Sequence, residues 1–70
     1  MQKINSSKDF GLAVKNQRKI KGYTQQYICD VTGLSVSFIS NLENGKPTCE
    51  LNKAIQVANL VGLDVFCSSR

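Results

Sequence analysis

The sequence predicts a small all-α domain of four to five helices, followed by a short β-strand near the C-terminus. Seventy residues form one domain with limited apolar surface for a core, so association with another chain is a natural supplement. Hydrophobic residues make up 41% of the chain, with five Gly and one Pro, which is typical of a folded, mostly helical protein. The third observation is the segment Tyr23–Pro47, in which two helix-capping residues flank a glycine.

The first helix is expected to begin after Ser6 and to run to about Lys21. Ser6 is a suitable N-cap, and Asp9, three residues later, resembles the acidic partner of a capping box. Gly22 would end the helix. The face predicted to be buried carries Phe10, Ala13, Val14 and the aliphatic stem of Arg18.

The second and third helices are predicted at about residues 25–32 and 36–44. Thr24 can cap the second helix with its hydroxyl group, and Ser35 can cap the third in the same way. Gly33 stands between them, where a sharp inter-helix turn needs a positive φ. These local signals agree on a helix-turn-helix unit over residues 24–44.

The fourth helix is predicted to follow Thr48, its expected N-cap, and to end at Gly62. It carries an apolar stripe at i, i+3, i+4 and i+7: Leu51, Ala54, Ile55, Ala58 and Val61. Residues 49–67 are therefore expected to form a dimerisation helix and strand within a single domain of residues 1–70.

The tail LDVFC alternates between apolar and polar residues, which indicates a β-strand. The chain offers no convincing partner strand, residues 3–5 being a weak candidate, and an isolated strand cannot satisfy its backbone groups. Pairing with the same strand of a second subunit across a two-fold axis would resolve this. The alternative is a frayed tail that packs Val65 and Phe66 on its own domain.

The chain resembles the Cro/C1 (phage-repressor, XRE-type) helix-turn-helix family over about residues 8–67. The resemblance rests on the order of the motifs, which are GYTQ, Cys29, Gly33, Ser35, Ile39 and LENGKP, and on Gly11, Val14 and Arg18 upstream. It implies a lambda-repressor-like DNA-binding fold. The short chain with a terminal GLDVFC most resembles HipB-type antitoxins.

In such a fold the third helix reads DNA bases with its early residues. Ile39 and Leu42 are needed for the core. The side chains left to point outward are the candidate base-reading set: Ser35, Val36, Ser37, Ser40 and Asn41. Asn41 could pair with an adenine edge and Val36 could touch a thymine methyl. Since no Arg or Gln stands among them, part of the specificity is expected to come from DNA shape.

The resemblance also implies roles for residues outside this set. Gln25, at the start of the second helix, would bind a backbone phosphate, while Asn44 and Lys46 would hold the backbone on the other side of the groove. Arg18 and Glu43 would form a buried, structural ion pair.

A homodimer is expected, with an interface formed by Val57, Leu60, Leu63, Val65 and Phe66. Its DNA partner would be a palindromic operator. Leu12 and Ile20 on the first helix, with Val57 or Leu60, offer further apolar surface, which suggests a second protein partner. By resemblance this partner would be a HipA-like kinase toxin.

The net charge is +4, and six of the nine basic residues lie within the first 21 positions, either as a solvated helix face or as a phosphate-facing flank. There is no His and there are three Cys at spacings unlike a zinc motif, so neither catalysis nor a metal or other cofactor is expected. Without an apolar leader or a membrane-length run, a cytoplasmic protein is expected.

The function expected from the sequence is a sequence-specific DNA-binding transcriptional repressor, the antitoxin of a HipBA-like operon that it autoregulates. Two alternatives stay open. One is a stand-alone phage or restriction-modification controller repressor, and the other is a domain that acts mainly as a protein-interaction module.

Overall fold

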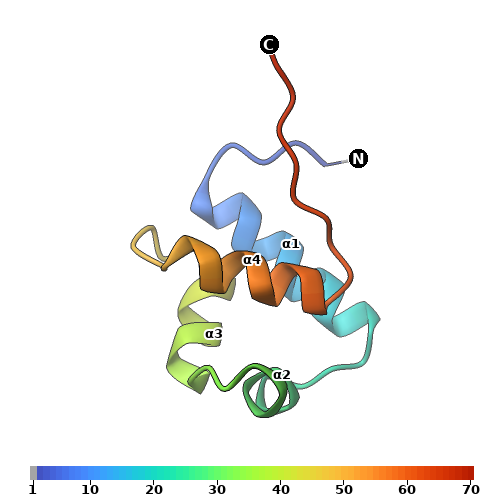
Figure 1. The fold of residues 1–70 in the computed structure, drawn as a ribbon, viewed down its shortest axis with the longest axis vertical. Helices are drawn as coiled ribbons and strands as arrows, with labels where there is room; N and C mark the ends of the chain where they lie inside the picture. The colour runs from blue at the N-terminus through green and yellow to red at the C-terminus, as the bar shows by residue number, and fades with distance from the viewer. Residues whose placement is uncertain (1) are drawn as a thin grey trace.

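Four helices form the fold: α1 Ser7–Ile20, α2 Gln25–Thr32, α3 Val36–Glu43 and α4 Leu51–Leu60 (Figure 1). The computed structural model describes residues 2–70. The helices lie where the sequence predicts them, and their number is the lower of the two predicted. None of these four helices has the length and apolar composition needed to cross a bilayer.

Three of the four helices begin at the predicted N-caps. The hydroxyl oxygens of Ser6, Thr24 and Ser35 each accept a hydrogen bond of 3.0 Å from the backbone N–H three residues later. Asp9 adds a bond in which its Oδ2 accepts from the N–H of Asn5 at 3.1 Å, one residue upstream of the position in a standard capping box. These bonds satisfy N–H groups that a helix start otherwise leaves without a partner.

The predicted cap of the fourth helix is wrong. Glu50, rather than Thr48, is the N-cap of α4, and its carboxylate accepts from the N–H groups of Asn52 at 3.1 Å and Lys53 at 3.0 Å. A carboxylate can take two N–H groups at once and is further stabilised by the positive end of the helix dipole, which a threonine hydroxyl cannot match. Thr48 instead lies in the turn after α3.

Glycines at two of the helix contacts show two different geometric requirements. Gly33 ends α2 with φ of +76°, the left-handed conformation predicted for the turn, and its N–H donates to the carbonyl of Cys29 at 2.8 Å. Gly11 serves a different purpose, because a Cβ there would collide with the carbonyl oxygen of Leu42. This close approach lets α1 pack directly against the end of α3.

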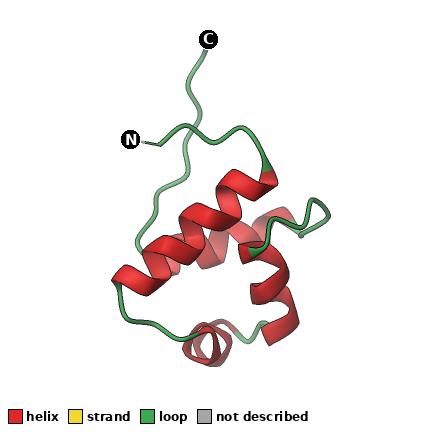
Figure 2. Cartoon of the chain, turned by 180° about the vertical axis from the view of Figure 1, so that it is seen from behind, coloured by secondary structure: helices red, strands yellow, loops and turns green. Residues whose placement is uncertain are grey.

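The core lies where all four helices meet, and its largest fully buried side chains come from these helices and from the cap that ends α4: Val14, Ile28, Ile39, Val57 and Val61. Figure 2 shows the same helices from behind, with α2 seen end-on below the others. The placement of Val57 corrects the expected dimer interface. Its side chain has no exposed surface in the single chain, so it belongs to the core and cannot contact a partner.

The tail after α4 does not form the predicted strand, and residues 2–70 contain no strand at all (Figure 2). The physical reason is that a strand needs a hydrogen-bonded neighbour, and residues 3–5 do not pair with the tail. Leu63 packs on the core, whereas Val65 and Phe66 are 48% and 63% exposed. The single chain therefore has the frayed tail of the alternative prediction. That alternative expected Val65 and Phe66 to pack on their own domain, and both are more exposed than such packing would leave them.

Candidate nucleic-acid interface

The outer face of α3 carries the residues predicted to read bases. Ile39 and Leu42 are buried on its inner face. Successive residues of a helix are rotated by about 100°, which places Ser37 and Asn41 on the opposite, outer face. Of the candidate set, three side chains are exposed and two are half-buried; the exposed ones are Ser35, Val36 and Ser37, and the half-buried ones are Ser40 and Asn41.

These side chains differ in how much hydrogen-bonding capacity they keep. Ser35 uses its oxygen as the α3 cap, and Ser40 accepts a long bond of 3.4 Å from the amide of Asn44, although each hydroxyl can still donate. The side chains of Ser37 and Asn41 have no hydrogen-bond partner within residues 2–70. Their hydroxyl and amide groups are the ones on this face best able to bond to base edges.

Phe38 is the aromatic residue of α3. It is half-buried and packs against the core cluster beside α3. Its ring therefore supports the helix rather than the outer face.

The start of α2 presents free backbone donors. Gln25 is the first helical residue, after the cap Thr24. The backbone N–H groups of Gln25 and Gln26 have no acceptor within the described chain, because the capping hydroxyl accepts from Tyr27 and the carbonyl of Thr24 accepts from Ile28. Free N–H groups at the positive end of a helix favour an anion such as a phosphate.

A buried polar network joins α1, α2 and α3. Arg18 and Glu43 form the ion pair that the resemblance implied, with Nε to Oε2 at 2.6 Å and Nη2 to Oε1 at 3.1 Å. The side chains are 12% and 2% exposed. Arg18 also donates through Nη1 to the carbonyl of Tyr23 at 2.8 Å, so all three guanidinium nitrogens are engaged.

Gln25 belongs to this network, which the sequence did not predict. Its Nε2 donates to Oε1 of Glu43 at 3.0 Å. The residue expected to bind phosphate is thus also bonded to the structural ion pair. The separation of 18 positions between them matches no helical or strand periodicity, so no signal in the sequence could have identified this contact.

The loop after α3 carries the other two residues predicted to bind phosphate, Asn44 and Lys46, both exposed. Lys46 donates its N–H to the carbonyl of Asn41 at 2.9 Å, which folds the loop back on the helix end. Ser7 ties the loop to α1, since its hydroxyl donates to the carbonyl of Gly45 at 2.9 Å. The loop is therefore held at both sides.

This arrangement brings one more cation to the loop. A Cβ on Gly45 would lie 2.7 Å from the Cα of Lys8, so the start of α1 abuts the loop that carries Lys46. Lys8 is one of the six basic residues within the first 21 positions. Lys8 is exposed, and its backbone lies beside the loop that carries Lys46.

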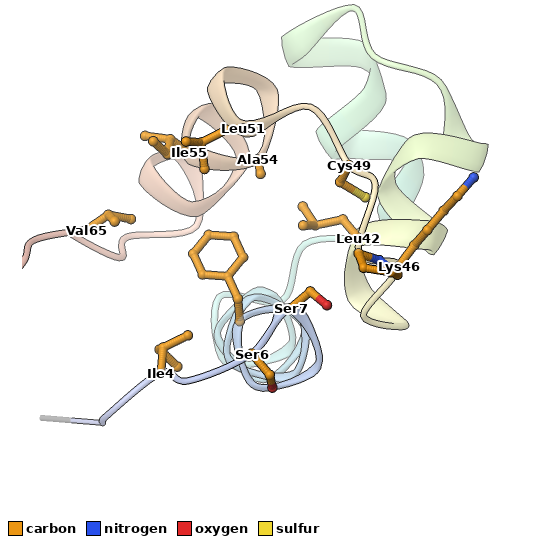
Figure 3. Close-up of a pocket in the computed structure, with 12 residues that line it drawn as sticks. Ile4, Ser6, Ser7, Leu42, Lys46, Cys49, Leu51, Ala54, Ile55 and Val65 are labelled. Carbon is orange, nitrogen blue, oxygen red and sulfur yellow. The ribbon is translucent and has the colours of Figure 1, made fainter.

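An apolar groove of about 330 Å³ lies between the start of α1, α4 and the C-terminal tail (Figure 3). Its apolar walls include Ile4, Leu51, Ile55 and Val65. Lys46 is at the rim, and its ammonium group points away from the apolar side chains in Figure 3. Of the residues expected at a dimer interface, Val65 lines this groove, and Phe66 lies next to it in the chain.

Comparison with known proteins gives a consistent family. A family model described as helix-turn-helix matches residues 14–65. The chain is 33% identical over 64 residues to the uncharacterized HTH-type transcriptional regulator y4mF of Sinorhizobium fredii, a match that covers 91% of this chain and 84% of that protein. It is 54% identical over 37 residues to the competence pilus inhibition repressor of Acinetobacter baylyi, covering 53% of this chain and 34% of that protein.

Solved structures agree with the fold over its whole length. The protein in a HipB–O4 20mer complex superposes with a TM-score of 0.86 at 27% identity, covering 100% of both chains. A second HipB complex, with an O2 20mer, gives a TM-score of 0.86 at 27% identity over 100% of this chain and 99% of that one.

The regulators of this family are not enzymes, in agreement with the expectation from the sequence. The chain belongs to the Cro/C1-type helix-turn-helix family of DNA-binding transcriptional regulators.

Proposed function

We propose that this chain is a homodimeric, sequence-specific transcriptional repressor that binds a palindromic operator through α3. The observation that carries the proposal is the outer face of α3, where the amide of Asn41 and the hydroxyl of Ser37 are free, while the phosphate-binding candidates Gln25 and Lys46 contact the C-terminal part of the same helix. Free base-reading groups on one helix face, with candidate phosphate contacts held against the same helix, suit a helix lying in the major groove.

The base-reading roles follow from the chemistry of each group. Asn41 suits an adenine N6/N7 edge, Val36 suits a thymine methyl, and the serines can donate or accept. The short, neutral side chains of the set make few strong direct contacts, so operator shape contributes part of the specificity. Asn44 and Lys46 hold the backbone beyond α3, and Lys8 can join them.

The dimer rests on the exposed apolar residues after α4. Val65 and Phe66 are 48% and 63% exposed beside the apolar groove, which is an unfavourable state for a lone chain in water. Pairing of the Leu63–Cys67 tails across a two-fold axis would cover these side chains and supply the missing strand partner. Leu60 and Leu63, both half-buried, would border the interface.

The finer proposal is that the chain is the cytoplasmic antitoxin of a HipBA-like operon, with a HipA-like kinase as its toxin. It is supported by the full-length likeness to HipB chains and by Leu12 and Ile20 on α1, which are 50% and 77% exposed. The rival reading, a stand-alone repressor, is supported by the likeness to a competence pilus inhibition repressor.

Selection of binding sites from a pool of randomised duplexes tests the repressor proposal. We expect an enriched inverted repeat whose half-site centres are about 34 Å apart, one turn of B-DNA. The Asn41→Ala variant should lose the enrichment, whereas Asn16→Ala, a matched change on the exposed side of α1, should keep it. Enrichment of no repeat by the wild-type chain would reject the proposal.

Co-expression with the product of the adjacent gene tests the antitoxin proposal separately. A complex that survives purification and is lost in Ile20→Asp, but not in the neighbouring exposed variant Lys19→Asp, would support it. A repressor that binds its selected site but forms no such complex is a stand-alone regulator.

A further inference from the structure

The side chain of Gln25 is bonded on one side to a buried carboxylate and borders solvent on the other. We propose that Glu43, neutralised by Arg18, is a positioning residue that orients the amide of Gln25 toward a DNA backbone phosphate. This inference rests on the proposed function, in which Gln25 binds phosphate, and adds a role in DNA binding for an ion pair that otherwise serves the fold.

The identity of the partner fixes the orientation of the amide. A carboxylate can only accept hydrogen bonds, so the nitrogen of Gln25, and not its oxygen, must face Oε1 of Glu43 at 3.0 Å. A free glutamine can present either its donor or its acceptor to an anion. Here the nitrogen uses one hydrogen toward Glu43 and keeps the second for a group outside the protein.

The remaining hydrogen is well placed to act together with the backbone. Gln25 is half-buried at the first turn of α2, where the N–H groups of Gln25 and Gln26 have no acceptor within residues 2–70. An anion at this helix start would meet two backbone donors and the side-chain donor of one residue. The hydrogen bond to Glu43 is the observation that distinguishes this helix start from that of an ordinary helix.

The charge of Arg18 makes the arrangement compatible with DNA. A lone carboxylate behind the amide would repel a phosphate, and a half-buried position screens that repulsion weakly. Arg18 binds both oxygens of Glu43, so the ion pair has no net charge. The amide is then held by a neutral support and presents a donor outward.

The hydrogen bond from Gln25 to Glu43 should raise DNA affinity because it orders the glutamine side chain before DNA binds. A mobile glutamine loses rotamer freedom when it grips a phosphate, and that loss weakens binding. In this chain the side chain is already ordered by Glu43 on folding. Removing the support should therefore weaken DNA binding, even though Glu43 and Arg18 do not touch DNA.

A double-mutant cycle in DNA affinity tests the proposal. The support is removed by the paired change Arg18→Met and Glu43→Leu, which leaves the net charge at +4 because it deletes one cation and one anion. The contact is removed by Gln25→Met, in each background. The probe is a mixed-sequence duplex of about 20 base pairs, two helical turns, because a phosphate contact does not depend on sequence.

We expect Gln25→Met to weaken binding about tenfold in the wild-type background and less than about threefold once the support is gone. Binding is compared only among chains shown to be folded by circular dichroism. The same loss in both backgrounds would overturn the proposal, because Gln25 would then act alone. If the wild-type chain binds neither this duplex nor any selected site, the proposed function itself is rejected and this inference with it.

A second measurement needs no ion-pair variant. In NMR spectra of the DNA-free wild-type chain, the side-chain amide of Gln25, identified by its loss in Gln25→Met, should be ordered, with one hydrogen shifted by the carboxylate. Adding the duplex should move the other hydrogen. The exposed Gln56, which has no hydrogen-bond partner within the described chain, is the internal control. A Gln25 amide as mobile as that of Gln56 would refute the positioning role even if DNA binding is normal.

Discussion

Replacing Arg18 by methionine should remove a large part of the stability of this domain. Glu43, 2% exposed, would then lose both guanidinium bonds and keep the single neutral donor of Gln25. Stranding one partner of a buried pair costs about 3–5 kcal/mol. The free energy of unfolding of a native protein is about 0.05–0.15 kcal/mol per residue, which gives about 4–10 kcal/mol in total for a chain of this length. The single variant should therefore be close to unfolding at room temperature.

The paired variant Arg18→Met with Glu43→Leu should recover much of that loss. It removes both charges and fills the site with apolar groups of similar size, so no buried carboxylate is left without a cation. The expected coupling between the two sites is about 2 kcal/mol or more, well above the few tenths seen for residues that do not meet.

Urea unfolding followed by circular dichroism at constant pH measures all of these changes. Lys19→Met is the matched control, since it replaces an exposed cation of α1 that no acidic residue of the described chain pairs with, and it should change the free energy of unfolding by less than about 0.5 kcal/mol. Additive effects of the Arg18 and Glu43 changes, or an Arg18 variant as stable as the Lys19 variant, would refute the reasoning.

Three further outcomes are expected. Asn41→Ala should weaken operator binding by about 1–3 kcal/mol and leave binding to random DNA unchanged. Lys46→Ala should weaken binding to both kinds of DNA alike and lower the slope of log affinity against log salt concentration by about one. Equal losses for Asn41→Ala on operator and random DNA would remove Asn41 from the base-reading set. Sedimentation equilibrium at about tens of micromolar should give a dimer for the wild-type chain and a monomer for Phe66→Asp, and a wild-type monomer would contradict the proposed interface. Gly11→Ala should destabilise the fold by about 1–3 kcal/mol in urea unfolding, because its Cβ overlaps a carbonyl oxygen of α3, and a stabilised variant would show that the two helices separate easily.

The helices and their first three caps were predictable because each signal is local. A cap such as Ser35 depends on one side chain and on an N–H three residues later, and Gly33 marks its turn by backbone conformation alone. The cap of α4 was missed because two acceptable residues compete there, and the carboxylate of Glu50 takes two donors where Thr48 could take one.

Features that depend on tertiary packing were predicted less accurately from the sequence. The wide apolar surface of α4 suggested Val57 for an interface, yet this side chain is completely buried in the core that the helices share. The strand at Leu63–Cys67 needs a neighbour that a single chain does not supply. Contact between Gln25 and Glu43 depends on how α2 and α3 cross, which residue periodicity does not encode.

The position of the two chain ends has a practical consequence for fusion proteins. The N-terminal segment and the end of the C-terminal tail both lie on the side of the molecule opposite α2, within residues 2–70 (Figures 1 and 2). A fluorescent label joined to the N-terminus should therefore stand clear of the start of α2. Two labels joined to the C-termini of a dimer would be brought together by the paired tails, so energy transfer between them would report assembly in living cells without altering the helices.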